Sequence, residues 1–203
     1  MHVNKILRCI LPVAVGLLVL TACSKERVVL PRYEYDATLA EAYYFGADAQ
    51  KGVDLFRLDL AQGRLDEDSM ELLSAGAVML LQISAPVEDN TTLPAGTYHG
   101  SAEGDQAYTY TYGQLLDGDV IVGSSVGIRA EGAKQTQFYP VEKGRLTVSV
   151  SDKSGLYEVR IEAEAAGKTF TFAYRGEITT VDCSNVSGKN FAYNPGMFWF
   201  RQH

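Results

Sequence analysis

The sequence lacks a hydrophobic run long enough to cross a bilayer as a helix. Its longest run, "ILPVAVGLLVL" at residues 10–20, is about half of the roughly 20 apolar residues that a spanning helix requires. Lys5 and Arg8 precede this run, and small residues follow it. A short apolar core with basic residues before it and small residues after it is typical of a secretory signal. The sequence therefore predicts export of the chain.

The end of this segment reads Leu20-Thr21-Ala22-Cys23. It resembles the lipobox of bacterial lipoproteins, in which a small peptidase site requires small residues and the Cys thiolate accepts the lipid. The resemblance implies a signal peptide over 1–22, acylation of Cys23 by chains such as palmitate, and anchoring in a membrane. Two or three acyl chains give stable anchoring. We interpret residues 23–36 as the tether and 37–203 as the domain.

The residue after the acylated Cys bears on the destination. It is Ser24, where Asp would indicate retention in the inner membrane, so we expect the outer membrane. Ser24 to Arg27 reads "SKER", a poor match to the acidic cluster that sends some lipoproteins to the cell surface. A periplasmic and a cell-surface face both stay open.

Basic residues are also scarce. Without Lys5 and Arg8, 16 bases face 25 acids, a net charge of −9. An acidic chain with no basic stripe repels phosphate backbones, so nucleic acid is not expected as a partner.

Cysteine and histidine are few. With Cys9 in the signal and Cys23 acylated, only Cys183 is left, which excludes an intramolecular disulfide. We interpret Cys183 as a buried small apolar residue. His99 and His203 are too far apart, with one thiol, for a typical zinc set. Acidic pairs such as Asp117 and Asp119 match no calcium-loop spacing, so no metal and no cofactor is predicted.

The sequence shows no sustained helical periodicity. Instead, apolar and polar residues alternate along several segments. Phe56, Leu58 and Leu60 share one face of a strand, with Arg57 and Asp59 predicted on an outward face. The run "AVMLLQIS" (77–84) is apolar on both faces and predicts a central strand. "GRLTVSVS" (144–151) and "LYEVRIEAEA" (156–165) predict a hairpin, and "KTFTFAY" (168–174) predicts another strand. About nine or ten mostly antiparallel strands predict a single all-β domain, a β-sandwich or a barrel.

Four features occur together in this chain: the lipobox, the "AYYFG…VDLFRLDL" hairpin, "VMLLQISAP" before "LPAGTYHG", and the closing strands from Gly144 to Ile178. This combination resembles a family of small Bacteroidetes-type outer-membrane lipoproteins of unknown function. The resemblance implies an all-β envelope lipoprotein and no particular chemistry.

Catalysis has little support. "GSSVG" (123–127) fits the G-x-S-x-G pattern that presents a nucleophilic Ser on a strand-to-helix turn. No helical pattern follows Ser125, and a hydrolase would need His99 close to Ser125 or Cys183. Whether the chain is an enzyme is left open, with a preference against it. Asp68-Ser69-Met70 also resembles a short O-glycosylation motif of Bacteroidetes-type bacteria, which makes Ser69 a candidate for modification.

Aromatic residues suggest binding. Tyr108, Tyr110 and Tyr112 are predicted to share one face, and Trp199 lies in an aromatic tail. Exposed rings stack on sugars and anchor protein interfaces, whereas buried rings fill a core. We therefore expect a non-enzymatic binding or adhesion module for glycan or an envelope protein. The alternative is an assembly component that adds a strand to a neighbour, which requires an unpaired sheet edge. A Ser or Cys hydrolase is a weaker hypothesis.

Overall fold

The protein is described by a computed structural model that covers residues 29–66, 71–88, 90–117, 120–185 and 200–201. These residues form strands and connecting loops, as the sequence predicts, and no helix in these ranges could span a bilayer. The strand segments are more numerous than the predicted nine or ten, because the chain between 109 and 140 forms several short strands. They are β1 (Arg32–Asp36), β2 (Leu39–Asp48), β3 (Val53–Gln62), β4 (Gly76–Pro86), β5 (Gly96–Ser101), β6 (Thr109–Thr111), β7 (Gln114–Leu116), β8 (Val120–Val122), β9 (Ser125–Arg129), β10 (Gln137–Pro140), β11 (Lys143–Val150), β12 (Tyr157–Ala165), β13 (Lys168–Gly176), β14 (Thr179–Asp182) and β15 (Phe200–Arg201).

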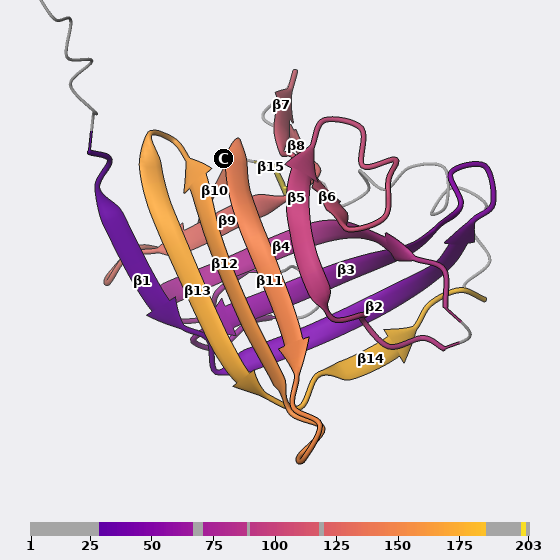
Figure 1. The fold of residues 1–203 in the computed structure, drawn as a ribbon. Coiled ribbons are helices and arrows are strands. Elements are labelled where there is room, and N and C mark those ends of the chain that lie inside the picture. The colour runs from indigo at the N-terminus through magenta and orange to yellow at the C-terminus, as the bar shows by residue number, and fades with distance from the viewer. Residues whose placement is uncertain (1–28, 67–70, 89, 118–119, 186–199, 202–203) are drawn as a thin grey trace, which may run out of the picture.

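Most strands belong to one strongly curled sheet. Its order is β1-β13-β12-β11-β5-β6-β4-β3-β2-β14, with β9 added to β4 and β10 added to β9. Figure 1 shows β1, β13, β12 and β11 as a front layer that crosses β2, β3 and β4 behind it. A small second sheet has the order β15-β8-β7. The architecture is therefore a half-barrel whose two layers face each other across a core.

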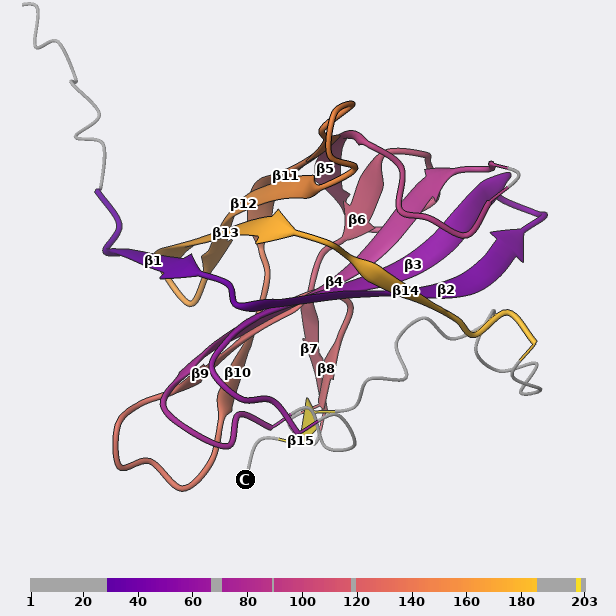
Figure 2. The same ribbon diagram turned by 90° about the horizontal axis from the view of Figure 1, so that it is seen from below.

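The two layers are joined at a corner between β1 and β2. The Ala37 N–H donates to the Ala173 carbonyl of β13 at 2.8 Å, and the Thr38 N–H donates to the Ala61 carbonyl of β3 at 2.8 Å. Consecutive residues thus bond to opposite layers, which is how a strand changes sheets in a barrel-like sandwich. Figure 2 shows the layers meeting where β1 runs into β2.

The core fills the space between the layers, and alternation explains its composition. Leu146 and Val148 of β11 and Val159 and Ile161 of β12 are buried, while the residues between them are exposed. Phe170 and Phe172 of β13 are buried opposite Phe56, Leu58 and Leu60 of β3. The predicted central strand is confirmed, because β4 is buried on both faces.

The second face of β3 departs from the prediction. Arg57 and Asp59 were expected to point into solvent, but they are only 6% and 1% exposed. A second apolar cluster covers part of this face of the sheet; it contains Ala61, Leu72, Val78, Leu80, Ile121 and Phe138. The prediction was wrong because local alternation cannot show what later segments place over the second face of a strand.

The start of the domain also differs from the prediction. Residues 32–36 were assigned to the tether, but they form β1, which pairs in parallel with β13 from Arg32 opposite Thr169 to Asp36 opposite Ala173. The charged residues and Pro31 read as a linker, yet "RYEYD" alternates charged and aromatic side chains. The domain therefore begins at least five residues earlier than expected.

Candidate functional site

The predicted tyrosine row does not form a flat exposed platform. Tyr110 is completely buried, so its ring cannot meet a ligand at the surface, and this corrects its assignment as a binding residue. Tyr108 precedes β6, has a positive φ of 58°, and is 39% exposed. Tyr112 follows β6, is half-buried, and packs edge-on against Tyr110 with ring centroids 6.0 Å apart.

Glycines of β5 explain where the two outer rings lie. A Cβ at Gly96 would lie 2.4 Å from Cε1 of Tyr108, and a Cβ at Gly100 would lie 1.9 Å from Cε1 of Tyr112. Each ring therefore lies directly against the β5 backbone, where only glycine leaves space. These rings are parts of the sheet packing, and Tyr108 alone presents a substantial exposed surface.

Several predicted residues lie outside the described residues. Cys23, Ser69 and Trp199 are among them, together with most of the aromatic tail. The acylation of Cys23, the glycosylation of Ser69 and a binding role for Trp199 therefore stay predictions.

The described residues do not assemble the hydrolase set. Ser125 is the first residue of β9, opposite Leu80 of β4, and does not lie on a strand-to-helix turn. Its buried hydroxyl has no hydrogen-bond partner among the described residues, so it makes no hydrogen bond to His99, which is exposed on β5. Cys183 is only partly buried, so the prediction of a buried residue was wrong. This partial burial still raises the pKa of its thiol, which favours the unreactive protonated form. Across the described ranges, no group of three or more His, Cys, Asp or Glu side chains could hold a metal ion.

The feature with binding potential is the free edge of β1. The Thr169 N–H donates to the Pro31 carbonyl at 2.8 Å, and Ala37 donates to Ala173 at 2.8 Å. The backbone N–H and C=O groups of successive residues point to opposite sides of a strand. The backbone groups of Tyr33 and Tyr35, like the Pro31 carbonyl and the Ala37 N–H, therefore point toward β13. The N–H and C=O groups of Arg32, Glu34 and Asp36 consequently point away from the sheet, and no hydrogen bond joins them to another described residue. An edge of this kind is a template for another strand.

The inner face of β1 carries two tyrosines on the rim of the core. The ring of Tyr33 stacks on Phe170 with centroids 5.6 Å apart, and the ring of Tyr35 lies 5.0 Å from Phe172. Phe170 and Phe172 are buried, but Tyr33 is 41% exposed. The edge therefore leaves aromatic surface uncovered beside unpaired backbone groups.

The outer face of β1 carries the charges of Arg32, Glu34 and Asp36, all exposed. The Arg32 guanidinium reaches Glu162 of β12 at 3.1 Å, with the two side chains 52% and 49% exposed. An ion pair this exposed contributes little stability, so Arg32 can change partners at small cost.

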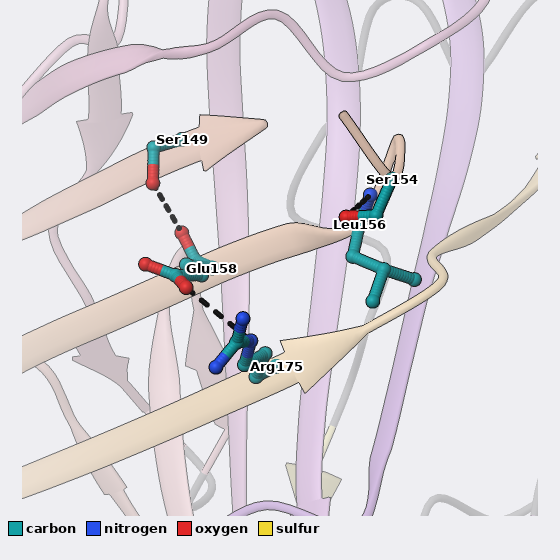
Figure 3. Close-up of polar contacts among 5 residues, drawn as sticks. All are labelled: Ser149, Ser154, Leu156, Glu158 and Arg175. Atoms are coloured by element: carbon teal, nitrogen blue, oxygen red, sulfur yellow. Dashed lines mark hydrogen bonds and ion pairs between the residues drawn. The ribbon is translucent and has the colours of Figure 1, made fainter. Parts of the chain in front are cut away.

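The outer face of β11 and β12 is polar and solvated, whereas Thr169 and Thr171 on the outer face of β13 are buried. Figure 3 shows Glu158 of β12 between Ser149 of β11 and Arg175 of β13. The Ser149 hydroxyl donates to the Glu158 carbonyl at 3.4 Å, and Arg175 pairs with the Glu158 carboxylate at 3.3 Å. Their exposure makes these contacts weak, and the face offers a ligand no apolar anchor.

A shallow open cleft lies where β1 begins. Its volume is about 630 Å³, and it is lined by Val29, Leu30, Arg32, Lys143, Glu164 and Thr169. Two of these lining residues, which face each other on β11 and β12, form an ion pair: the Lys143 ammonium lies 3.4 Å from the Glu164 carboxylate. Val29 and Leu30, just before β1, form one wall of this cleft.

The large sheet has two other free edges within the described residues, at β10 and β14. The small sheet ends at β15 and at β7, which is only three residues long and carries the exposed Leu115 and Leu116. The edge of β10 ends at Pro140, which has no N–H to offer a new strand. The edge of β14 is four residues long, Thr179–Asp182, and is followed by Ser184, whose hydroxyl donates to Asp182 at 2.6 Å. Among the described edges of the large sheet, that of β1 is the one that combines unpaired backbone with a strongly exposed aromatic side chain, Tyr33.

No protein-family model, no curated protein and no solved structure matches this chain. The site is therefore defined by its geometry alone. Sequence reasoning missed the β1 edge, although the period-2 alternation of "RYEYD" was a signal that could have revealed it.

Proposed function

We propose that this protein is a lipid-anchored protein of the bacterial cell envelope whose β domain is a non-enzymatic binding module. It engages a protein partner by strand addition at the edge of β1. The lipobox at Leu20 to Cys23 supports the anchor. The observation that carries the binding mode is the outward row of N–H and C=O groups at Arg32, Glu34 and Asp36.

The other form of the binding hypothesis, a glycan platform, has weaker support. It needs several exposed rings in one plane, but Tyr110 is buried and Tyr112 packs against Gly100. Strand addition needs an unpaired edge, which β1 provides.

Strand addition is tested by site-specific photo-crosslinking in the native organism. A photoreactive residue replaces Asp36 on the edge, or Arg160 on the solvated face of β12 as a control. We expect a protein adduct from position 36 and none from position 160. Adding Glu34→Pro, which removes an outward N–H, should abolish the adduct, whereas Glu34→Ala, which keeps that N–H, should preserve it. Equal adducts with Pro and Ala would overturn the proposal.

The anchor is tested separately by metabolic labelling with an alkyne analogue of palmitate. The wild-type chain should be labelled and recovered with outer membranes, and Cys23→Ser should lose the label. Labelling of the Cys23→Ser variant would overturn the anchor. Protease shaving of intact cells then decides the face: release of domain peptides indicates the cell surface, and release only after lysis indicates the periplasm.

A further inference from the structure

We propose that the strand added at this edge is β1 of a second copy of the same chain, paired antiparallel with Glu34 on the two-fold axis. This inference rests on the proposed strand addition and names its partner. The five residues "RYEYD" are complementary to themselves in this register at the backbone, on the outer face and on the inner face.

The backbone fixes the register. An antiparallel pair exchanges N–H···O=C bonds only between residues whose groups both point across the gap. On β1 these are Arg32, Glu34 and Asp36. Placing Glu34 opposite the partner's Glu34 puts Arg32 opposite the partner's Asp36, so every outward group of the strand is satisfied. A register centred on Arg32 or on Asp36 leaves part of the row unpaired.

The outer face becomes complementary in charge. In this register the Arg32 guanidinium of each copy faces the partner's Asp36, and symmetry makes the contact twice. Opposite charges on directly facing residues stabilise a sheet. The two Glu34 carboxylates meet on the axis, and this like-charge contact weakens the pair without changing its register.

The inner face becomes complementary in shape. Tyr33 faces the partner's Tyr35 in the closely spaced, non-hydrogen-bonded position, where side chains approach most. Tyr33 is 41% exposed on the single chain. Facing aromatic pairs are among the favourable cross-strand pairs, and here they would cover the rim of the core at Phe170.

The isolated interface is small, since five residues of strand bury less than the roughly 1,000 Å² of a stable complex. Confinement of both copies to one membrane raises their effective concentration and compensates for weak contacts. Self-pairing is therefore expected on the membrane, and the test uses the full chain there.

Cysteine scanning tests the register. Single Cys substitutions are made at Arg32, Glu34 and Asp36 in the full-length chain, on a Cys183→Ser background, and membranes are oxidised with a copper catalyst. Facing residues of a hydrogen-bonded antiparallel pair lie about 5.5 Å apart at Cα, within the range of a disulfide. Glu34→Cys should give a covalent homodimer. Arg32→Cys and Asp36→Cys should give none alone and a dimer when the two variants are co-expressed.

The pattern of disulfides in the cysteine scan distinguishes self-pairing from the alternatives. Homodimers at position 34 together with the mixed 32–36 product support self-pairing. Equal homodimers at all three positions indicate random collision and overturn it. A disulfide from position 34 to a different protein overturns self-pairing but leaves strand addition standing. No disulfide at position 34 overturns self-pairing, whereas strand addition to a different partner is decided by the photo-crosslinking at position 36, which needs no thiol on the partner.

A charge reversal separates complementarity from folding. With Glu34→Cys as reporter, Arg32→Asp places two acids opposite each other, and the homodimer yield should fall about tenfold. The double variant Arg32→Asp with Asp36→Arg restores opposite charges between copies and should restore the yield. Arg32 is replaced in both variants, so both lose its ion pair with Glu162 within the chain, and they differ only in the charge at position 36. A low homodimer yield in the double variant would therefore overturn the proposed register.

Discussion

Arg57 and Asp59 lie two residues apart on β3 and form an ion pair of 2.9 Å, with their side chains only 7% and 1% exposed. The guanidinium also lies over the ring of Tyr43, with Cζ 4.1 Å from the ring centroid. The Tyr43 hydroxyl in turn donates to Glu41 at 2.9 Å. This charged row crosses β2 and β3 on the face opposite the core. Removing one partner of a buried ion pair destabilises a protein by more than forming the pair stabilises it, because an uncompensated charge stays buried. The row therefore favours the one packing of the covering segments that keeps both charges paired.

The buried carboxyl predicts a pH-dependent stability. Burial raises the pKa of Asp59 to about 7, against a lowering by Arg57, whereas an unfolded Asp titrates near pH 4. Between these values the folded state holds more protons than the unfolded state. This contribution to the free energy of unfolding is therefore fully present below about pH 4 and is lost as the pH rises to about 7. Urea titrations from pH 4 to 8 should show this loss, and Asp59→Asn should remove it.

The matched control for this titration is Asp152→Asn. Asp152 is exposed in the turn between β11 and β12, so its replacement should leave the pH profile as in the wild type. A profile that Asp59→Asn does not change would show that the slope comes from other groups.

Tyr110 provides the second prediction. It is fully buried, and its hydroxyl has no hydrogen-bond partner among the described residues. Tyr110→Phe removes a buried polar atom and should leave stability unchanged or raise it by about 1 kcal/mol. Tyr110→Ala leaves a large cavity and should cost about 3–5 kcal/mol. Denaturant unfolding measures both, and a Tyr110→Phe variant as unstable as Tyr110→Ala would contradict this account.

The sequence predicted the strands whose alternation decides their burial. On β12, Val159 and Ile161 are buried and Glu158 and Arg160 are exposed, as expected from position alone. That rule works where one face meets solvent. It failed for Arg57 and Asp59 because distant segments cover their face, and the sequence does not show which segments return to which strand.

The candidate site was hidden for a related reason. Parallel pairing of β1 with β13 joins segments more than 130 residues apart, and no local pattern encodes it. Pro31 and the charges favoured a tether, although Tyr33 and Tyr35 were in register for a strand. Conversely, the tyrosines at 108–112 alternate with threonines as in a strand. The positive φ at Tyr108 interrupts the extended backbone that would have placed all three rings on one face.

The third prediction concerns the contact between β5 and Tyr112. A methyl group at Gly100 would lie 1.9 Å from the Tyr112 ring, so Gly100→Ala must displace that ring. We expect a cost of about 1–3 kcal/mol, the usual range for overpacking. In the Tyr112→Ala background the same change should cost much less, because the clash is gone. Urea unfolding of all four chains measures this coupling, and purely additive effects would contradict the contact.

The last prediction separates the two faces of β1. Tyr35 packs on Phe172 with centroids 5.0 Å apart and lies on the rim of the core. Tyr35→Ala should therefore lower the free energy of unfolding of the domain by about 2–3 kcal/mol. Glu34→Ala, next to it on the exposed face, should change that free energy by less than about 0.5 kcal/mol. If β1 were part of a loose tether, neither substitution would alter thermal or urea unfolding. A cost at Tyr35 alone establishes β1 as a strand of the fold and leaves its outer residues free for binding.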